Sequence, residues 1–456
     1  MQNFKPTRRS ILAGAGASAL AWRAGFAQTA PVVLTAQRAS VQIAPKGYPQ
    51  TEVWAYDGAL PGPQLRVPQG ARLRRRFVNK LDVASSIHWH GIRIDNAMDG
   101  VAGLTQDAVP PGNSFDYDFT LPDAGSYWYH AHTNSMEQVA RGLSGPLIVE
   151  EPEALDVDRD EVLMLDDWLL NPETAQIDPD FSQPMDLSHG GRLGNLIGTN
   201  GRFNHRLAVK RHERLRLRLI NAANARIFVL RLVGVSGWQV ALDGMPLPTP
   251  QPVAQELILA PAQRIDLIVD VMAEGAQAAI ERLGNDDQWH AQIGFEIAGQ
   301  ASRARRDPPS ALPPNPRMDL PDLAQARQLE MKIEGGAMGR MAMGQMRSLM
   351  QSGKFWTLGG QAGPGEAPFA RLSRGEPVRL RLLNDTAFPH AMHLHGMHFR
   401  EVLPEGRFGP MRDTILTMAG QSQEIAFIAD NPGKWLLHCH MLAHAAAGMT
   451  RWIEVA

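Results

Sequence analysis

Ten of the 15 histidines lie in four short clusters, an arrangement typical of metal binding. The ten are His88, His90, His130, His132, His390, His393, His395, His438, His440 and His444. Eight of them form His-x-His pairs, and in a β-strand residues i and i+2 point to the same face. Each pair would therefore aim two imidazoles in one direction. The four pairs predict eight converging imidazoles, with two pairs supplied by each of two distant parts of the chain.

The only cysteine, Cys439, stands between His438 and His440. Because successive side chains of a strand point to opposite faces, its thiol would point away from both imidazoles. His390 is offset by an odd number of residues from the pair at 393–395, so in a regular strand it would share the face of the thiol. The sequence thus predicts a second site on the opposite face, which the following loop can complete. Its members are His390, Cys439, His444 and Met449.

These two ligand sets favour copper over other metals. Two imidazoles, a thiolate and a weak thioether describe a blue-copper electron-transfer site. Eight imidazoles without a carboxylate describe a cluster of copper ions rather than magnesium, calcium or non-haem iron. Zinc accepts such ligands, but it is redox-silent and leaves the His-Cys-His bridge unexplained. Since consecutive Cα atoms are about 3.8 Å apart, the bridge would join the two sites by a short covalent path.

The elements that position these side chains are predicted to be strands. An apolar, arginine-bearing segment that ends in Asn occurs three times, at residues 76–79, 218–221 and 381–384. Alternating apolar and basic residues lead into the second and third copies, which is typical of strands with one buried face. The 42 glycines and 33 prolines also suit many short strands joined by turns. We therefore expect three similar β-domains.

A second repeat links the first and third of these domains. The segment at 88–91 (HWHG) matches that at 393–396 (HLHG), and residues 125–132 match residues 433–440. The two motifs are 42 residues apart in the first domain and 45 in the third. No His-x-His pair occurs in the middle domain, which is therefore expected to carry no metal.

Composition excludes several classes of partner. The 456 residues have a formal net charge of -2 and no long basic run beyond the first ten residues. We therefore expect neither nucleic acid nor an anionic membrane surface as a partner. With 44% hydrophobic residues the chain can bury a large core, and its length fits two to four domains.

The first 27 residues are predicted to be an export signal. Paired arginines, Arg8 and Arg9, precede an apolar stretch that is too short to span a bilayer. This pattern is typical of a twin-arginine signal peptide, and an ordinary secretory signal is the alternative. Either reading predicts a periplasmic protein with no stable membrane anchor.

The motifs HWHG, YHAH, HAMHLHG and HCHMLAHAAAGM together resemble those of the multicopper oxidases, which include laccases and bacterial cuprous oxidases. The resemblance implies an all-β chain of three consecutive cupredoxin-like Greek-key β-sandwich or barrel domains. These would be domain 1 at 28–152, domain 2 at 153–300 and domain 3 at 325–456, with a linker at 301–324.

The resemblance also implies four coppers per chain. Type 1 copper would be held by His390, Cys439 and His444, with Met449 as axial ligand, and type 2 copper by His88 and His393. The type 3 pair would take the remaining six ligands, namely His90, His130, His132, His395, His438 and His440. Substrate electrons would pass from type 1 copper through Cys439 to His438 and His440, and dioxygen would be reduced to water between domains 1 and 3. The axial methionine implies a low or middle type 1 potential.

Asp99 follows the first histidine motif and matches the family's acidic residue beside type 2 copper. The resemblance implies a role in proton supply. The simpler alternative is a turn aspartate, which its position before Gly100 would also explain. The chain has Ala445 where several bacterial relatives place an acid, and this would leave more of the proton supply to Asp99.

The sequence leaves two classes of electron donor open. Met331, Met338, Met341, Met343, Met346 and Met350 precede the copper motifs of domain 3. Bacterial cuprous oxidases carry a methionine-rich insertion at a similar place, and thioethers suit Cu(I). The alternative is an apolar helix or lid in which methionine fills space, although nearby glycines weaken a helix. Thr386 and Phe388 stand where those enzymes have Asp and Met substrate ligands, so a phenol remains possible.

Dioxygen and a small reducing substrate are therefore the expected partners, and a monomer is the expected state. Lone histidines such as His189 and His398 are interpreted as structural, and the arginines of the linker as solvated. The alternatives to an oxidase are a copper-binding protein without turnover, a copper-free relative that acts in cell division, and a copper nitrite reductase. The last would not need four His-x-His pairs in one chain.

Overall fold

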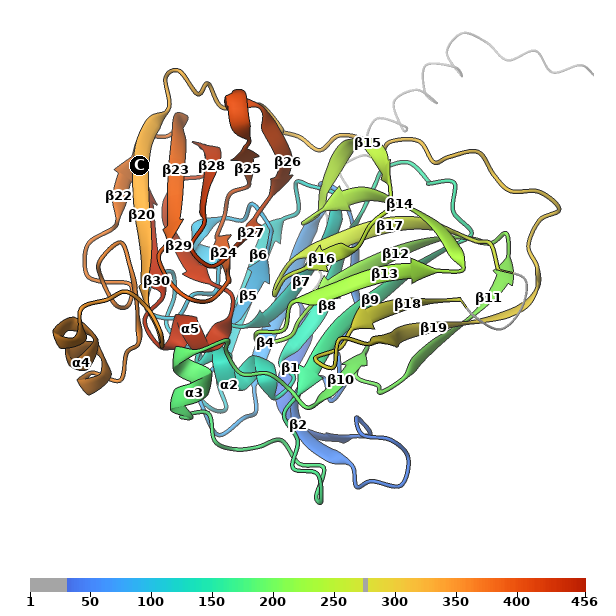
Figure 1. The fold of residues 1–456 in the computed structure, drawn as a ribbon, viewed down its shortest axis with the longest axis horizontal. Helices are drawn as coiled ribbons and strands as arrows, with labels where there is room; N and C mark the ends of the chain where they lie inside the picture. Colours follow the sequence, from blue (N-terminus) through green and yellow to red (C-terminus); the bar gives the residue numbers. More distant parts are fainter. Residues whose placement is uncertain (1–30, 274–277) are drawn as a thin grey trace, which may run out of the picture.

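The computed structural model describes residues 31–273 and 278–456, and the predicted export signal lies outside them. Strands in the described residues form six sheets, which pair into three sandwiches along the chain (Figure 1). The prediction of an all-β fold is confirmed. No helix in this part of the chain is long and apolar enough to cross a membrane.

The first sandwich pairs two four-stranded sheets, ordered β2-β1-β4-β6 and β3-β8-β7-β5. Its strands are β1 (Val32–Val41), β2 (Thr51–Tyr56), β3 (Leu65–Pro68), β4 (Arg72–Asn79), β5 (Ile87–His90), β6 (Ser114–Thr120), β7 (Gly125–Ala131) and β8 (Ser144–Glu150). The short helices η1 (Asn96–Met98) and α2 (Ser135–Ala140) follow β5 and β7.

The middle sandwich pairs a six-stranded sheet, β10-β9-β12-β17-β14-β15, with a five-stranded one, β11-β19-β18-β13-β16. Its strands are β9 (Arg159–Trp168), β10 (Leu196–Thr199), β11 (His205–Arg211), β12 (Arg214–Asn221), β13 (Phe228–Val233), β14 (Val235–Leu242), β15 (Met245–Pro252), β16 (Leu257–Leu259), β17 (Arg264–Val271), β18 (Ala278–Leu283) and β19 (Trp289–Gln300). Helix α3 (Pro184–Ser188) lies between β9 and β10 in sequence.

The third sandwich pairs the sheets β21-β20-β23-β28-β25-β26 and β22-β30-β29-β24-β27. Its strands are β20 (Arg327–Gly335), β21 (Trp356–Leu358), β22 (Ala370–Leu372), β23 (Glu376–Asn384), β24 (His390–Leu394), β25 (Phe399–Val402), β26 (Phe408–Arg412), β27 (Thr414–Thr417), β28 (Ser422–Ala429), β29 (Gly433–Cys439) and β30 (Thr450–Val455). Its helices are α4 (Met343–Gln351), η2 (Pro404–Gly406) and α5 (Leu442–Ala446).

The repeated Asn ends equivalent strands in the three sandwiches and brackets the loop that follows. Asn79, Asn221 and Asn384 end β4, β12 and β23. Each is buried, accepts a backbone N–H from the residue two positions later, and donates to two or more backbone carbonyls across the loop. A buried side-chain amide that satisfies these backbone groups explains why the motif recurs.

The prediction of one buried face holds for β23 but is wrong for β12. In β23 Val378, Leu380 and Leu382 are buried while the residues between them are not, whereas every residue of β12 is buried. The arginines of β12 lie against carboxylates: Arg216 bonds Asp266, and Arg218 bonds Asp160. Ion pairing allows a charged face to be buried, which the sequence pattern does not reveal.

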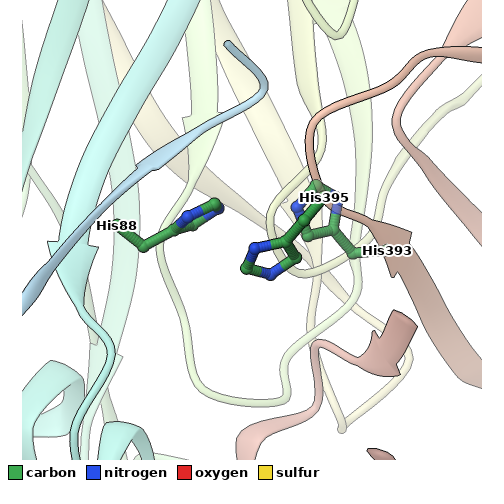
Figure 2. Close-up of side chains that lie close together, drawn as sticks. All are labelled: His88, His393 and His395. Carbon is green, nitrogen blue, oxygen red and sulfur yellow. The ribbon is translucent and has the colours of Figure 1, made fainter. Parts of the chain in front are cut away.

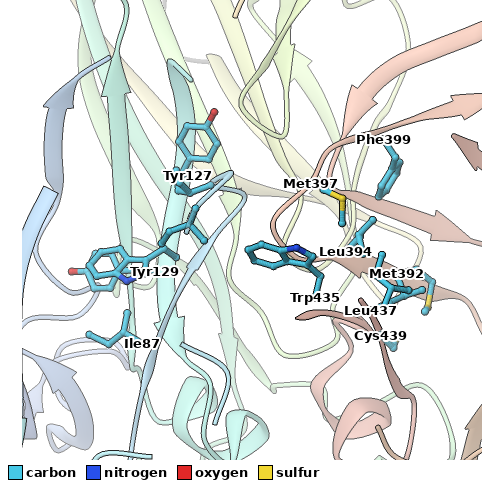
Figure 3. Close-up of a cluster of buried hydrophobic side chains, with 14 of the residues drawn as sticks. Ile87, Tyr127, Tyr129, Met392, Leu394, Met397, Phe399, Trp435, Leu437 and Cys439 are labelled. Carbon is cyan, nitrogen blue, oxygen red and sulfur yellow. The ribbon is translucent and has the colours of Figure 1, made fainter. Parts of the chain in front are cut away.

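The first and third sandwiches share one hydrophobic core. It includes Tyr127 and Tyr129 of β7 together with Met392 of β24 and Trp435 of β29. Figure 3 shows side chains from both sandwiches, with Trp435 drawn between the two groups. The middle sandwich has a separate core of its own. The shared core holds β5 and β7 in a fixed relation to β24 and β29.

The segment at 301–324 is not a free linker. Asn315 is buried and bonds both backbone groups of Ala124 in domain 1. Arg306 pairs with Asp156 and Asp158, and Arg317 pairs with Asp430. The expectation of solvated arginines holds for Arg317, whose side chain is 46% exposed, whereas Arg306 is half-buried because the segment runs along the sandwiches and meets their carboxylates.

Candidate metal centre

Strand pairing positions the histidine pairs. In domain 1, His88 of β5 lies opposite His130 of β7. In domain 3, His393 of β24 lies opposite His438 of β29. Residues of one register on adjacent strands share a face, so each domain presents its imidazoles together.

The eight imidazoles from the two domains meet. The rings of His88 and His395 stack at 3.9 Å between centroids, and those of His90 and His393 at 3.7 Å. Figure 2 shows His88 facing His393 and His395 from the opposite ribbon. Candidate ligand atoms lie within 4.8 Å of one another in several groups of three: His88, His393 and His395; His88, His90 and His130; His132, His395 and His438. His440 joins through its Nε2 atom, 3.4 Å from that of His130.

The chemistry of this cluster fits a metal. At least one ring nitrogen of His88, His90, His132, His393 and His440 is buried without a hydrogen-bond partner among the described residues. Unsatisfied buried polar atoms are costly unless something else occupies them. Burial, helped by neighbouring His393, lowers the pKa of His438 to about 3. The ring is thereby kept in the neutral form that binds metals.

The second site lies on the other face of β24 and β29. Nδ1 atoms of His390 and His444 lie 3.8 and 3.7 Å from the Cys439 sulfur, and 3.1 Å from each other. All three residues are fully buried. Burial raises the pKa of the Cys439 thiol to about 12, so the thiol keeps its proton until a metal displaces it.

Each imidazole of this second site is held from behind by an uncharged group. The Nε2 atom of His390 lies 2.8 Å from the Thr386 hydroxyl, and that of His444 donates to the His189 carbonyl at 2.7 Å. These contacts leave both Nδ1 atoms facing the thiol. Met449 is buried next to this group, and its carbonyl accepts the Cys439 N–H at 3.1 Å.

Asp99 is buried against two imidazoles of the cluster. Its carboxylate lies 3.0 Å from Nδ1 of His395 and 3.2 Å from Nδ1 of His88. Its backbone carbonyl also lies 2.8 Å from Nδ1 of His88. The side chain is therefore more than a turn residue: it orients these two imidazoles, as a carboxylate behind a metal-binding histidine does.

Sequence reasoning missed a second carboxylate, Asp413. It lies just before β27, is fully buried, and approaches Nε2 of His90 at 3.3 Å. Burial would raise the pKa of Asp413, but the charge of Arg264 and the contacts with His90 and His393 outweigh it and hold the pKa well below its usual range. No histidine motif surrounds Asp413 in sequence, so no local signal could have identified it.

Three further residues singled out in the sequence also have defined positions in the fold. His398 is buried with its Nε2 3.8 Å from Asp413, and burial lowers its pKa to about 3. His189 contributes its carbonyl rather than its ring to the thiol site. Phe388 packs against Trp356, at 6.1 Å between ring centroids.

The methionine segment divides into two parts. Met331 is fully buried in β20 and belongs to the core. The other methionines line a cavity of about 670 Å³ together with Phe355, and α4 forms there despite the nearby glycines. Met338 and Met343 are 76% and 83% exposed, so they belong to no packed core, and a helix beside a cavity fits both copper handling and the alternative of an apolar helix or lid.

Comparison with known proteins places the chain in a family. Family models described as multicopper oxidase match residues 37–154 and 337–456. The crystal structure of Lac15 from a marine microbial metagenome is 42% identical, with a TM-score of 0.78, over 93% of this chain and 100% of that one. A multi-copper oxidase from Pseudomonas thermotolerans is 34% identical, with a TM-score of 0.82, over 93% and 99%. The multicopper oxidase MmcO of Mycobacterium tuberculosis is 28% identical over 94% of this chain and 87% of its own.

The chain belongs to the multicopper oxidase family. It is a copper-dependent oxidoreductase that takes electrons from a reducing substrate and uses dioxygen as acceptor. The predictions of family, of cupredoxin-like fold and of reaction class are confirmed. The comparisons do not support a copper-binding protein without turnover, or a copper-free relative, better than they support an oxidase.

Proposed function

We propose that the chain binds four copper ions in two sites joined by Cys439. Type 1 copper would be held by His390, Cys439 and His444, with the thioether of Met449 as a weaker fourth ligand. Type 2 copper takes His88 and His393, and the type 3 pair takes the other six imidazoles. The main support for this assignment is the direction of three consecutive side chains. Cys439 faces His390 and His444. Its sequence neighbours, His438 and His440, face the imidazoles of domain 1.

Bound copper would supply the one-electron chemistry and the dioxygen reduction that side chains cannot provide. The chain's own residues hold the ligands, exclude water and keep the imidazoles neutral. Cys439 is joined through the backbone to His438 and to His440, so one short segment of the chain reaches both sites. Asp99 accepts a hydrogen bond from Nδ1 of His395 and lies beside His88, a position from which its carboxylate can hold and release a proton within the cluster.

The central test is made on purified, copper-loaded protein. We expect an intense thiolate-to-copper absorption in the visible range, separate type 1 and type 2 signals in electron paramagnetic resonance, and oxygen uptake with a suitable reductant. Absence of the visible band, together with no oxygen uptake with either Cu(I) or a phenol, would refute the assignment.

We further propose that the methionine-lined cavity receives the reductant, and that Cu(I) is a substrate. The cavity is lined by Ser188, whose sequence neighbour His189 accepts the hydrogen bond from His444. Thioethers bind Cu(I) well, and copper resistance protein A of Escherichia coli is 26% identical to this chain over 88% of it. An organic donor is the second candidate, because the cavity is largely apolar and Phe388 and Thr386 replace the substrate ligands of cuprous oxidases.

Replacing Met338, Met341, Met343, Met346 and Met350 together with Leu separates these donors. Leu keeps the apolar volume but removes the thioethers. If Cu(I) is a substrate, its oxidation at low concentration should fall by more than about tenfold while phenol oxidation is retained. Met185→Leu, which changes an exposed methionine on α3, is the matched control. Unchanged Cu(I) oxidation would exclude the thioethers as its binding site.

Location, state and domain limits complete the proposal. We infer export to the periplasm by the twin-arginine route, a monomeric state without a membrane anchor, and domains at 28–152, 153–300 and 325–456. The paired arginines at 8 and 9 support the route. Replacing both with lysine should leave precursor in the cytoplasm, whereas an ordinary secretory signal would still be processed.

A further inference from the structure

An arginine of the copper-free middle domain reaches the junction of all three domains. Arg264 begins β17 and is fully buried. Its Nη1 and Nη2 atoms donate to the two carboxylate oxygens of Asp413 in domain 3, at 2.9 and 2.6 Å. Its Nε donates to the carbonyl of Ser126 in domain 1 at 3.0 Å. A bidentate guanidinium–carboxylate pair of this kind fixes the plane of the carboxylate.

The carboxylate in turn touches two imidazoles of the three-metal cluster. Oδ1 of Asp413 lies 3.3 Å from Nε2 of His90 and 3.5 Å from Nδ1 of His393, and the backbone carbonyl of Asp413 lies 2.9 Å from that same Nδ1 atom. The Nδ1 atom of His90 and the Nε2 atom of His393 are the ring nitrogens left without a partner among the described residues. A carboxylate on one ring nitrogen decides which nitrogen is free for a metal and how the ring is turned.

The backbone of domain 1 leaves space for this arrangement. Gly91 follows His90 directly and has a φ of +86°. A Cβ at this position would lie 2.3 Å from Nη2 of Arg264 and 2.7 Å from Oδ2 of Asp413. The glycine of the HWHG motif is thus required because the ion pair occupies the place of a side chain.

We propose that Arg264 is a positioning residue for the three-metal site, acting through Asp413 on His90 and His393. The middle domain would then carry no copper and yet set the geometry of the cluster that forms between its neighbours. This inference rests on the proposed assignment of His90 and His393 as copper ligands.

The test compares two buried arginines of the same sheet, each in an ion pair. Arg264→Lys keeps the charge but loses the bidentate contact, and Arg264→Met removes both. Arg214→Lys is the matched control, since Arg214 pairs bidentately with Asp270 between β12 and β17, and its hydrogen-bond and ion-pair partners in the described residues include no histidine. Copper content, the thiolate-to-copper absorption per folded protein, the type 2 resonance and the thermal midpoint are measured for each.

We expect both Arg264 variants to lose type 2 and type 3 copper, or to shift the type 2 resonance, while the thiolate band is kept. Arg264→Lys should be the milder of the two. The control should lower the thermal midpoint with unchanged copper spectra. Spectra of the Arg264 variants equal to those of the control would overturn the inference and show a merely structural pair.

The route through Asp413 is tested by Asp413→Asn and by its combination with Arg264→Met. Asn keeps the shape of the side chain, so this variant also serves if Arg264→Met does not fold. Acting in series, the two single changes and the double should perturb the type 2 resonance to the same extent. Additive effects would contradict the route. Failure of the proposed function itself would be visible separately, as absence of type 2 and type 3 signals in the unmodified protein.

Discussion

At the scale of single residues, the two sites differ in the groups that contact the ring nitrogens of their imidazoles on the side away from the proposed metals. The thiol site has a hydroxyl and a carbonyl, from Thr386 and His189. The eight-imidazole site has two buried carboxylates, Asp99 and Asp413. A cluster of several copper ions needs more nearby negative charge than a single copper ion does. At the single-copper site the Cys439 thiolate already offsets one positive charge.

Cys439→Ser should abolish the visible thiolate absorption and lower oxygen uptake by at least about 100-fold, because the only sulfur that bridges the two sites is lost. Copper bound by the eight imidazoles should remain. Optical spectra, copper content and oxygen consumption check this. Ala131→Ser, at the equivalent position of β7, is the control and should keep the band; loss of all copper in Cys439→Ser would contradict the division into two sites.

Asp99→Asn should keep the visible band and slow dioxygen reduction by about 10- to 100-fold, since the ligands His88 and His395 lose their carboxylate. The measurement is steady-state oxygen uptake together with the rate at which reduced enzyme is reoxidised. Asp107→Asn, at an exposed position on the same loop, should behave like the unmodified protein. Equal reoxidation rates in the two variants would exclude the role of Asp99.

At the scale of elements, buried ion pairs tie adjacent strands of the middle sandwich. β9 and β12 run in parallel, and Asp160 of β9 bonds Arg218 of β12 through both carboxylate oxygens, at 2.7 and 2.8 Å. Burial would raise the pKa of Asp160, but hydrogen bonding and charge from Arg218 outweigh it and lower the pKa to about 2. The charged carboxylate is therefore stabilised in the folded state relative to the unfolded one.

Asp160→Asn should lower the free energy of unfolding at pH 7 by about 2 kcal/mol, from a pKa difference of roughly two units. Since the folded pKa is the lower one, this stabilisation is present above about pH 4 and is lost as the pH falls toward 2. Urea unfolding at pH 7 and at pH 3 measures the difference. Asp116→Asn, which breaks the exposed pair with Arg76, should cost less; an equal loss for Asp160→Asn at both pH values would contradict the linkage.

At the scale of the whole molecule, copper would join the first and third sandwiches, because the eight imidazoles come from both. Removing copper should therefore lower the thermal midpoint by several degrees, since a site in the presence of free ligand at 100 times Kd contributes about 2.7 kcal/mol. Calorimetry of chelated and reloaded protein checks this. Cys439→Ser should retain most of the effect; no shift on chelation would contradict copper bridging between the domains.

The sequence by itself determined the ligand types, their division between two faces and the repeated strands that carry them. These follow from residue spacing, because a strand alternates its side chains regardless of the rest of the fold. The motifs also sufficed to predict the family and the three-domain chain. Burial was read less well where charge was involved: β12 is buried on both faces because its arginines meet carboxylates from other strands.

Only the tertiary structure decided which groups stand behind the ligands. Asp413 and Arg264 are 149 residues apart in sequence, and neither lies in a motif. Met331 belongs to the same methionine-rich segment as Met338 and Met343. It is nevertheless buried in β20, whereas the other two line a cavity. Spacing along a strand constrains neighbours on that strand, whereas contacts between domains depend on how whole sheets pack, and no local pattern encodes that packing.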